Sequence, residues 1–153
     1  MANEPVKIVG SYLSPYVRKV LVCLHLKSID YVIDPVEHAL ASEASSGPGS
    51  ERPVPVFWDG SVTISDCTVI CEYLQDRYPE PSLYPVTPQA RARARWLEEY
   101  ADTRMGDVFF WRLFNERVIK RVRWGQEPDP AIVTRAQEIE MPLVLEYLER
   151  EFS

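Results

Sequence analysis

The Val54-Pro55 pair and the residues that follow it constrain the fold more than any other part of the chain. Proline has no backbone N–H, and an X-Pro bond is the peptide bond that adopts cis at modest cost. A cis bond here would turn the backbone of Val54 outward, beside two short strands joined by an Asp59-Gly60 turn. The sequence therefore predicts a backbone edge that is open to a peptide-like ligand.

A helix is expected directly after this hairpin. Ser65 and Asp66 are both good N-cap residues. Apolar residues then recur at helical spacing: Val69, Ile70, Tyr73 and Leu74. Because the first N–H groups of a helix lack internal partners and carry the positive end of its dipole, this end suits a ligand carboxylate. Asp66 itself is a candidate partner for a ligand ammonium group.

The residues before Val54 predict a strand, a helix and a second strand. Residues 6–9 and 31–33 are short apolar runs, and between them Ser14 and Pro15 form a good helix start. Parallel strands need a helical crossover of this kind, whereas an Asp-Gly turn supplies an antiparallel hairpin. The order predicts an α/β domain that contains both kinds of pairing.

The second half of the chain predicts helices. Three prolines in residues 78–85 indicate a linker, and Pro88 can open a long helix. Its expected inner face is Ala94, Leu97, Ala101, Met105 and Val108. A later helix is expected to carry its stripe at Ile132, Ala136, Ile139 and Leu143. Pro142 is expected to kink that helix because it removes a backbone hydrogen bond.

Several of these motifs, in this order, resemble the glutathione S-transferase family, whose first domain is thioredoxin-like. The matching segments are Ser14-Pro15-Tyr16, Val54-Pro55-Val56, Asp66-Cys67, Ile70-Cys71-Glu72-Tyr73-Leu74 and Arg77-Tyr78-Pro79. The likeness is to bacterial-type members of a serine-like class. It implies a thioredoxin-like α/β domain at residues 1–78, a linker at 79–87 and a partial all-α domain at 88–153. Because members usually continue through further helices, the second domain is expected to be shortened.

The resemblance also implies a glutathione site, in which Ser14 donates its hydroxyl to the glutathione thiolate. Tyr12 is the alternative, since some branches of the family use tyrosine just after the first strand. The backbone of Val54 would pair with the cysteinyl unit of glutathione, beside the bend held by Pro55. Asp66 would hold the γ-glutamyl end.

Three further positions complete the implied glutathione site. The backbone N–H of Cys67 would help to hold the γ-glutamyl end, although the family usually has serine at this position. Arg52, with His38 as the alternative, would meet the glycyl carboxylate. Residues 43–52 depart from the family pattern and are rich in Ser, Gly and Pro, which is typical of a loop.

An aromatic group on the long helix suggests a pocket for a second, apolar substrate. Phe109, Phe110, Trp111 and Phe114 cluster there, and the upper part of this helix faces the cleft in resembling proteins. Tyr12, Phe110 and Trp111 are the candidate pocket residues. The alternative is that these rings fill the helical core.

Composition limits the remaining possibilities. The chain has 153 residues, 46% of them hydrophobic, and a net charge of −6. This acidic balance argues against nucleic-acid binding, and no run is apolar enough for a membrane span or signal peptide. The cysteines Cys23, Cys67 and Cys71 lack the spacing of a zinc site, and their odd number is typical of a reducing compartment. We expect a cytoplasmic protein without a metal.

Two classes of function remain open. The first is a glutathione transferase that presents the thiolate to a small, apolar electrophile, with glutathione as the co-substrate. The second is a non-catalytic module of the same fold that binds a protein or a small ligand. The sequence does not choose among reaction types. Since family members are commonly homodimers, the resemblance also implies a homodimer.

Overall fold

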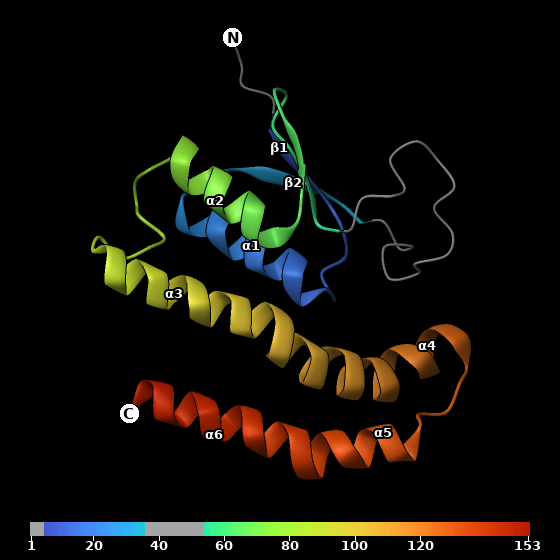
Figure 1. The fold of residues 1–153 in the computed structure, drawn as a ribbon. Helices are drawn as coiled ribbons and strands as arrows, with labels where there is room; N and C mark the ends of the chain where they lie inside the picture. The colour runs from blue at the N-terminus through green and yellow to red at the C-terminus, as the bar shows by residue number, and fades with distance from the viewer. Residues whose placement is uncertain (1–4, 36–53) are drawn as a thin grey trace. The chain divides into compact units, whose positions relative to one another are not determined.

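A computed structural model describes residues 5–35 and 54–153 of the chain (Figure 1). The described residues form two compact units, of which the first ends at Thr87 and the second spans Pro88–Ser153. Within the described residues, no helix is both long enough and apolar enough to cross a membrane.

The first unit contains a four-stranded sheet. Its strands are β1 (Val6–Val9), β2 (Tyr31–Asp34), β3 (Val56–Trp58) and β4 (Thr63–Ser65). They lie in the order β2-β1-β3-β4. Strand β1 pairs with β2 in parallel and with β3 antiparallel, and β3 pairs with β4 antiparallel. The predicted combination of a helical crossover and a hairpin is therefore confirmed.

Two helices, α1 (Pro15–Leu26) and α2 (Cys67–Arg77), lie side by side in this unit (Figure 1). Buried apolar side chains from both helices and from the sheet form one core: Val6, Ile8, Val17, Val20, Leu21, Leu24, Phe57, Cys67, Ile70, Cys71 and Leu74. Each fully buried side chain of Leu, Ile or Phe size contributes about 1.5–3 kcal/mol to folding. This core fixes the positions of the two helix N-termini relative to the sheet.

The second unit is helical. Its elements are α3 (Pro88–Tyr100), η1 (Ala101–Ile119), α4 (Lys120–Trp124), α5 (Pro130–Arg135), η2 (Ala136–Glu140) and α6 (Met141–Phe152). The first three form one long run and the last three a second run alongside it (Figure 1). Segments η1 and η2 have π-helical hydrogen bonding. Gly125, with a φ of 60°, ends the first run.

The helix faces predicted for this unit need correction. Ala101 is exposed, as are Ile139 and Leu143, at 57% and 54% of their surface. Ala136 is buried as predicted, but the second run also buries Val133, Glu140 and Val144, so its buried face is rotated by about one residue from the predicted stripe. In the first run, η1 has i→i+5 hydrogen bonds, so a stripe spaced for an α-helix drifts around the axis there. Pro142 lies in the first turn of α6, directly after η2, and the kink expected there stays a prediction.

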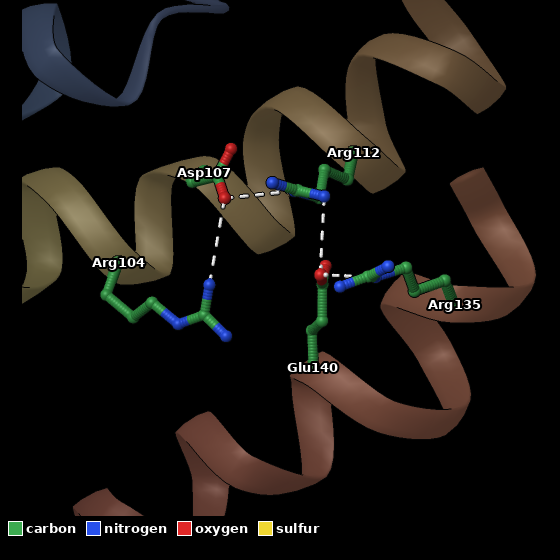
Figure 2. A network of polar contacts seen from close by, with 5 residues as sticks. All are labelled: Arg104, Asp107, Arg112, Arg135 and Glu140. Carbon is green, nitrogen blue, oxygen red and sulfur yellow. Dashed lines mark hydrogen bonds and ion pairs between the residues drawn. The ribbon is translucent and has the colours of Figure 1, made fainter.

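Buried carboxylates join the two helical runs. Glu140 is 5% exposed, and its Oε1 accepts hydrogen bonds from Arg112 Nη1 at 3.3 Å and Arg135 Nε at 3.0 Å. Arg112 also donates from Nε to Asp107 Oδ2 at 2.9 Å, and Arg104 Nη1 lies 3.8 Å from the same oxygen (Figure 2). Charge-assisted bonds of this kind offset the desolvation of a buried carboxylate.

A second buried carboxylate, Glu116, holds the turn between the runs. Its Oε1 lies 2.6 Å from Lys120 Nζ, and its Oε2 accepts the backbone N–H of Asp129 at 2.9 Å. Burial raises the pKa of Glu116, but these two contacts outweigh burial and hold it below its ordinary value. Glu116 therefore fixes the start of α5.

Candidate functional site

The candidate site of the first unit begins at the N-terminus of α1. Ser14 is the N-cap of this helix, and its side chain is 2% exposed. Its Oγ accepts the backbone N–H of Val17 at 3.4 Å. A hydroxyl has one donor and two acceptor positions, so this cap leaves the O–H available as a donor. The geometry is compatible with a plain cap and with a hydroxyl that also donates to a ligand.

Tyr12, the alternative thiolate partner, lies two residues before Ser14 in the loop that precedes α1. It exposes 56% of its surface. Leu13 donates its N–H to Ser11 Oγ at 3.2 Å, which helps to shape the loop. An exposed phenol remains in water, where a hydrogen bond to a thiolate is weaker than in a desolvated site.

The second part of the candidate site is the N-terminus of α2. Asp66 is the N-cap, and its Oδ1 accepts the backbone N–H groups of Thr68 at 2.9 Å and Val69 at 3.1 Å. Its Oδ2 makes no hydrogen bond within residues 5–35 and 54–153. The side chain is exposed, so this oxygen faces solvent. One carboxylate thus caps the helix and offers an acceptor to a ligand cation.

The backbone of Asp66 is in an unusual conformation, with φ 81° and ψ 127°. A non-glycine residue at positive φ costs about 1–3 kcal/mol and persists where its surroundings hold it. The next residue, Cys67, is the first of α2 and is 5% exposed. Backbone strain of this kind clusters at ligand-binding positions, so Asp66 is a candidate binding residue as well as a helix cap.

The Val54-Pro55 bond is cis. Val54 is half-buried, Pro55 is fully buried, and both come directly before β3. Strand β3 is central in the sheet and pairs with β1 on one side and β4 on the other. This pairing fixes the position of the backbone of Val54 and Pro55, which comes just before the strand.

A contact that the sequence did not reveal ties the hairpin to α2. The hydroxyl of Tyr73 donates to Asp59 Oδ2 at 2.5 Å, while Asp59 Oδ1 accepts from Ser61 and Val62. Burial raises the pKa of Asp59, but the bonds from Tyr73 and from the turn outweigh it and bring the pKa down to about 2. The same bond, followed by burial, raises the pKa of Tyr73. Asp59 is therefore a link to the helix as well as a turn residue.

The remaining predicted site residues lie elsewhere. Arg52 and the alternative His38 are outside the described residues. Tyr12 belongs to the first unit, whereas Phe110 and Trp111 belong to η1 of the second. Phe110 is 7% exposed and meets Trp111 edge to face, with ring centroids 4.9 Å apart, while Trp111 exposes 46% of its surface. Phe110 also stacks on Phe114.

Comparison with known proteins identifies the family. Residues 8–82 match the family model described as glutathione S-transferase, N-terminal domain. The chain belongs to the glutathione S-transferase family. The fold class is confirmed by the same finding together with the similar solved structures. The bacterial-type and serine-like detail of the resemblance stays a prediction.

Relatives of this glutathione S-transferase family member include plant and bacterial proteins. Glutathione S-transferase U13 of Arabidopsis thaliana is 35% identical over 105 residues, covering 65% of this chain and 46% of the relative. A glutathione S-transferase structure from Rhodospirillum rubrum F11 is 34% identical with a TM-score of 0.71, covering 94% of this chain and 64% of that one.

A third similar protein has been solved with a ligand. It is the theta class glutathione S-transferase of the citrus canker pathogen Xanthomonas axonopodis pv. citri, with glutathione bound. It is 25% identical with a TM-score of 0.75, covering 93% of this chain and 68% of that one. The chain spans about half the length of the curated relatives it matches.

Proposed function

We propose that the first unit binds glutathione and that the chain acts as a glutathione transferase, presenting the thiolate to a small, apolar electrophile. The observation that carries the proposal is Asp66, whose carboxylate caps α2 through Oδ1 and offers Oδ2 to solvent. Glutathione has an ammonium group at its γ-glutamyl end, and a carboxylate oxygen of this kind can accept a hydrogen bond from it. The family match over residues 8–82 supports the same assignment.

The remaining contacts of bound glutathione follow from the elements around Asp66. The backbone of Val54, just before β3, would pair with the cysteinyl unit. The N–H of Cys67, at the positive end of the α2 dipole, would face the γ-glutamyl carboxylate. Arg52 is proposed for the glycyl carboxylate.

Ser14 is proposed to stabilise the thiolate. A thiol with a pKa of about 8.5 is only a few per cent ionised at neutral pH. Lowering that pKa by ~2 units requires ~2.7 kcal/mol. A hydrogen bond to a charged group contributes ~1.5–3 kcal/mol and a helix N-terminus ~0.3–1 kcal/mol. Ser14, at the N-terminus of α1 and nearly excluded from water, supplies both contributions.

Calorimetric titration with glutathione tests the binding step. We expect saturable binding by the wild-type chain and a clear loss in Asp66→Ala. Thr68→Ala is a matched control, since it alters a neighbouring side chain of α2 while leaving the Asp66 carboxylate in place. An absence of heat or of saturation in the wild-type chain would refute glutathione binding. The molecular mass of the same sample tests the proposed homodimer.

Turnover of a generic aromatic electrophile tests the catalytic step. Ser14→Ala also removes a helix cap, so Ser14→Gly is the better variant, because glycine at an N-cap costs only a few tenths of a kcal/mol. We expect Ser14→Gly to keep the fold and lose most turnover. If Tyr12→Phe loses most turnover and Ser14→Gly keeps it, Tyr12 is the residue that stabilises the thiolate. Glutathione binding without any turnover would favour the non-catalytic module.

A further inference from the structure

Two cysteines of the first unit face each other across the contact between α1 and α2. The Sγ atoms of Cys23 and Cys71 are 3.2 Å apart. Cys71 is 2% exposed, whereas Cys23 is only half-buried. Cys23 is therefore the less buried residue of the pair, while Cys71 is held beside it in the core.

Hydrogen bonds on either side hold this pair in register. One helical turn before it, Lys19 Nζ donates to Thr68 Oγ1 at 2.9 Å. One turn after it, Lys27 Nζ donates to Gln75 Oε1 at 3.3 Å. The side chains thus meet pairwise along both helices, with the cysteines in the middle.

The separation of the sulfurs is close to that needed for a bond. A disulfide has an S–S length of about 2.05 Å, so the two atoms must approach by about 1.2 Å. Bond formation therefore requires rotation of the two side chains and an adjustment of the helices that carry them. The two flanking hydrogen bonds keep the cysteines opposite each other because they oppose sliding of one helix along the other.

We propose that Cys23 and Cys71 form a reversible intramolecular disulfide when the protein meets a hydroperoxide. The thiolate of Cys23, the less buried of the two cysteines, attacks the O–O bond; an S–O bond forms, the O–O bond breaks, and the leaving oxygen takes up a proton. The Cys71 thiolate then attacks the sulfenic sulfur; the S–S bond forms, the S–O bond breaks, and the departing hydroxide takes up a proton to become water. The two thiols lose two electrons and the hydroperoxide gains them. A thiol reductant reverses the change.

The cross-link would connect the two elements that carry the candidate site. Helix α1 begins after Ser14 and α2 begins after Asp66, and the disulfide would join these helices a little over two turns into α1 and about one turn into α2. The inference stands on the geometry of the cysteine pair and does not require glutathione binding.

Peptide mapping of the oxidised chain tests the proposal. The reduced wild-type chain is treated with hydrogen peroxide without glutathione, alkylated under denaturing conditions, digested with trypsin and measured by mass spectrometry. We expect peptide 20–27, which contains Cys23, to be joined to peptide 28–77 with the loss of two hydrogen atoms. Dithiothreitol should separate them.

Trypsin leaves Cys67 and Cys71 on the same peptide, so variants must identify the partner. Cys67→Ala should keep the joined peptides, and Cys71→Ala should lose them. Three alkylated thiols after peroxide treatment would overturn the proposal. So would sulfinic acid at Cys23 without a cross-link, a bond that survives in Cys71→Ala, or a bond between two chains. If a variant fails to fold, fragment ions of the joined wild-type peptides that break the chain between Cys67 and Cys71 identify which of the two carries the bond.

Discussion

The two units of the chain differ in what their interiors contain. The core of the first unit is a continuous set of apolar side chains shared by the sheet and two helices. The second unit buries two carboxylates, Glu116 and Glu140, among fewer apolar residues, and it leaves Ile139 and Leu143 exposed. The first unit therefore depends mainly on apolar burial, while the second also depends on charged hydrogen bonds between its helical runs.

The largest effect is expected from truncating the core of the first unit. Leu74→Ala removes a fully buried side chain of α2, and we expect the free energy of unfolding to fall by about 2–5 kcal/mol. Val69→Ala, on the exposed side of the same helix, should change it by less than about 0.5 kcal/mol. Urea denaturation followed by circular dichroism measures both. Equal losses would contradict the assignment of the core.

A smaller loss is expected when the charged contact of the second unit is broken. Glu140→Gln removes the charge that Arg112 and Arg135 contact, and both arginines are partly solvated. We expect a loss of about 1–3 kcal/mol in the free energy of unfolding. Glu138→Gln is the control because Glu138 is exposed on the same run. If the two variants were equally stable, Glu140 would not join the helical runs.

The link between Asp59 and Tyr73 predicts a pH dependence in the first unit. Asp59 has a folded-state pKa of about 2, below its ordinary value of 3.8. Its contribution to stability is therefore full above about pH 4 and is lost as pH falls from there toward 2. Tyr73→Phe should cost about 1 kcal/mol at neutral pH and flatten the dependence in this range. Thermal unfolding at several pH values, for both proteins, measures the difference. An unchanged slope would argue against the link.

The smallest effect is expected on the exposed face of the second unit. Ile139→Ala should change the free energy of unfolding by less than about 0.5 kcal/mol, since the side chain is 57% exposed. Val144→Ala, on the buried face of the same run, should cost more. A large loss in Ile139→Ala that depends on protein concentration would mean that a second copy covers this face.

The first unit was largely predictable from sequence because its signals are local. Ser14 and Asp66 are strong capping residues, the Asp59-Gly60 turn sets a hairpin, and alternating burial in short strands leaves few possible registers. The positive φ of Asp66 was not predictable from composition, since it depends on how the hairpin and α2 are held. The bond from Tyr73 to Asp59 joins residues 14 apart and has no local signal.

The second unit was predicted less well because η1 does not have the periodicity of an α-helix and because the second run buries a glutamate. An apolar stripe is found by assuming a constant number of residues per turn, and η1 violates that assumption. A buried glutamate adds a second source of error. Glu140 is read as a surface residue until its arginine partners, one of them 28 positions away, are known.

The central claim is that the helix N-termini of the first unit hold glutathione as a thiolate. The most direct measurement is the ultraviolet absorbance of the bound thiolate as a function of pH, in the wild-type chain and in Ser14→Gly. We expect the wild-type chain to lower the thiol pKa of bound glutathione by ~2 units from about 8.5. In Ser14→Gly, the thiol pKa of bound glutathione should return most of the way to about 8.5. A bound thiol that titrates at its free value in the wild-type chain would contradict the claim.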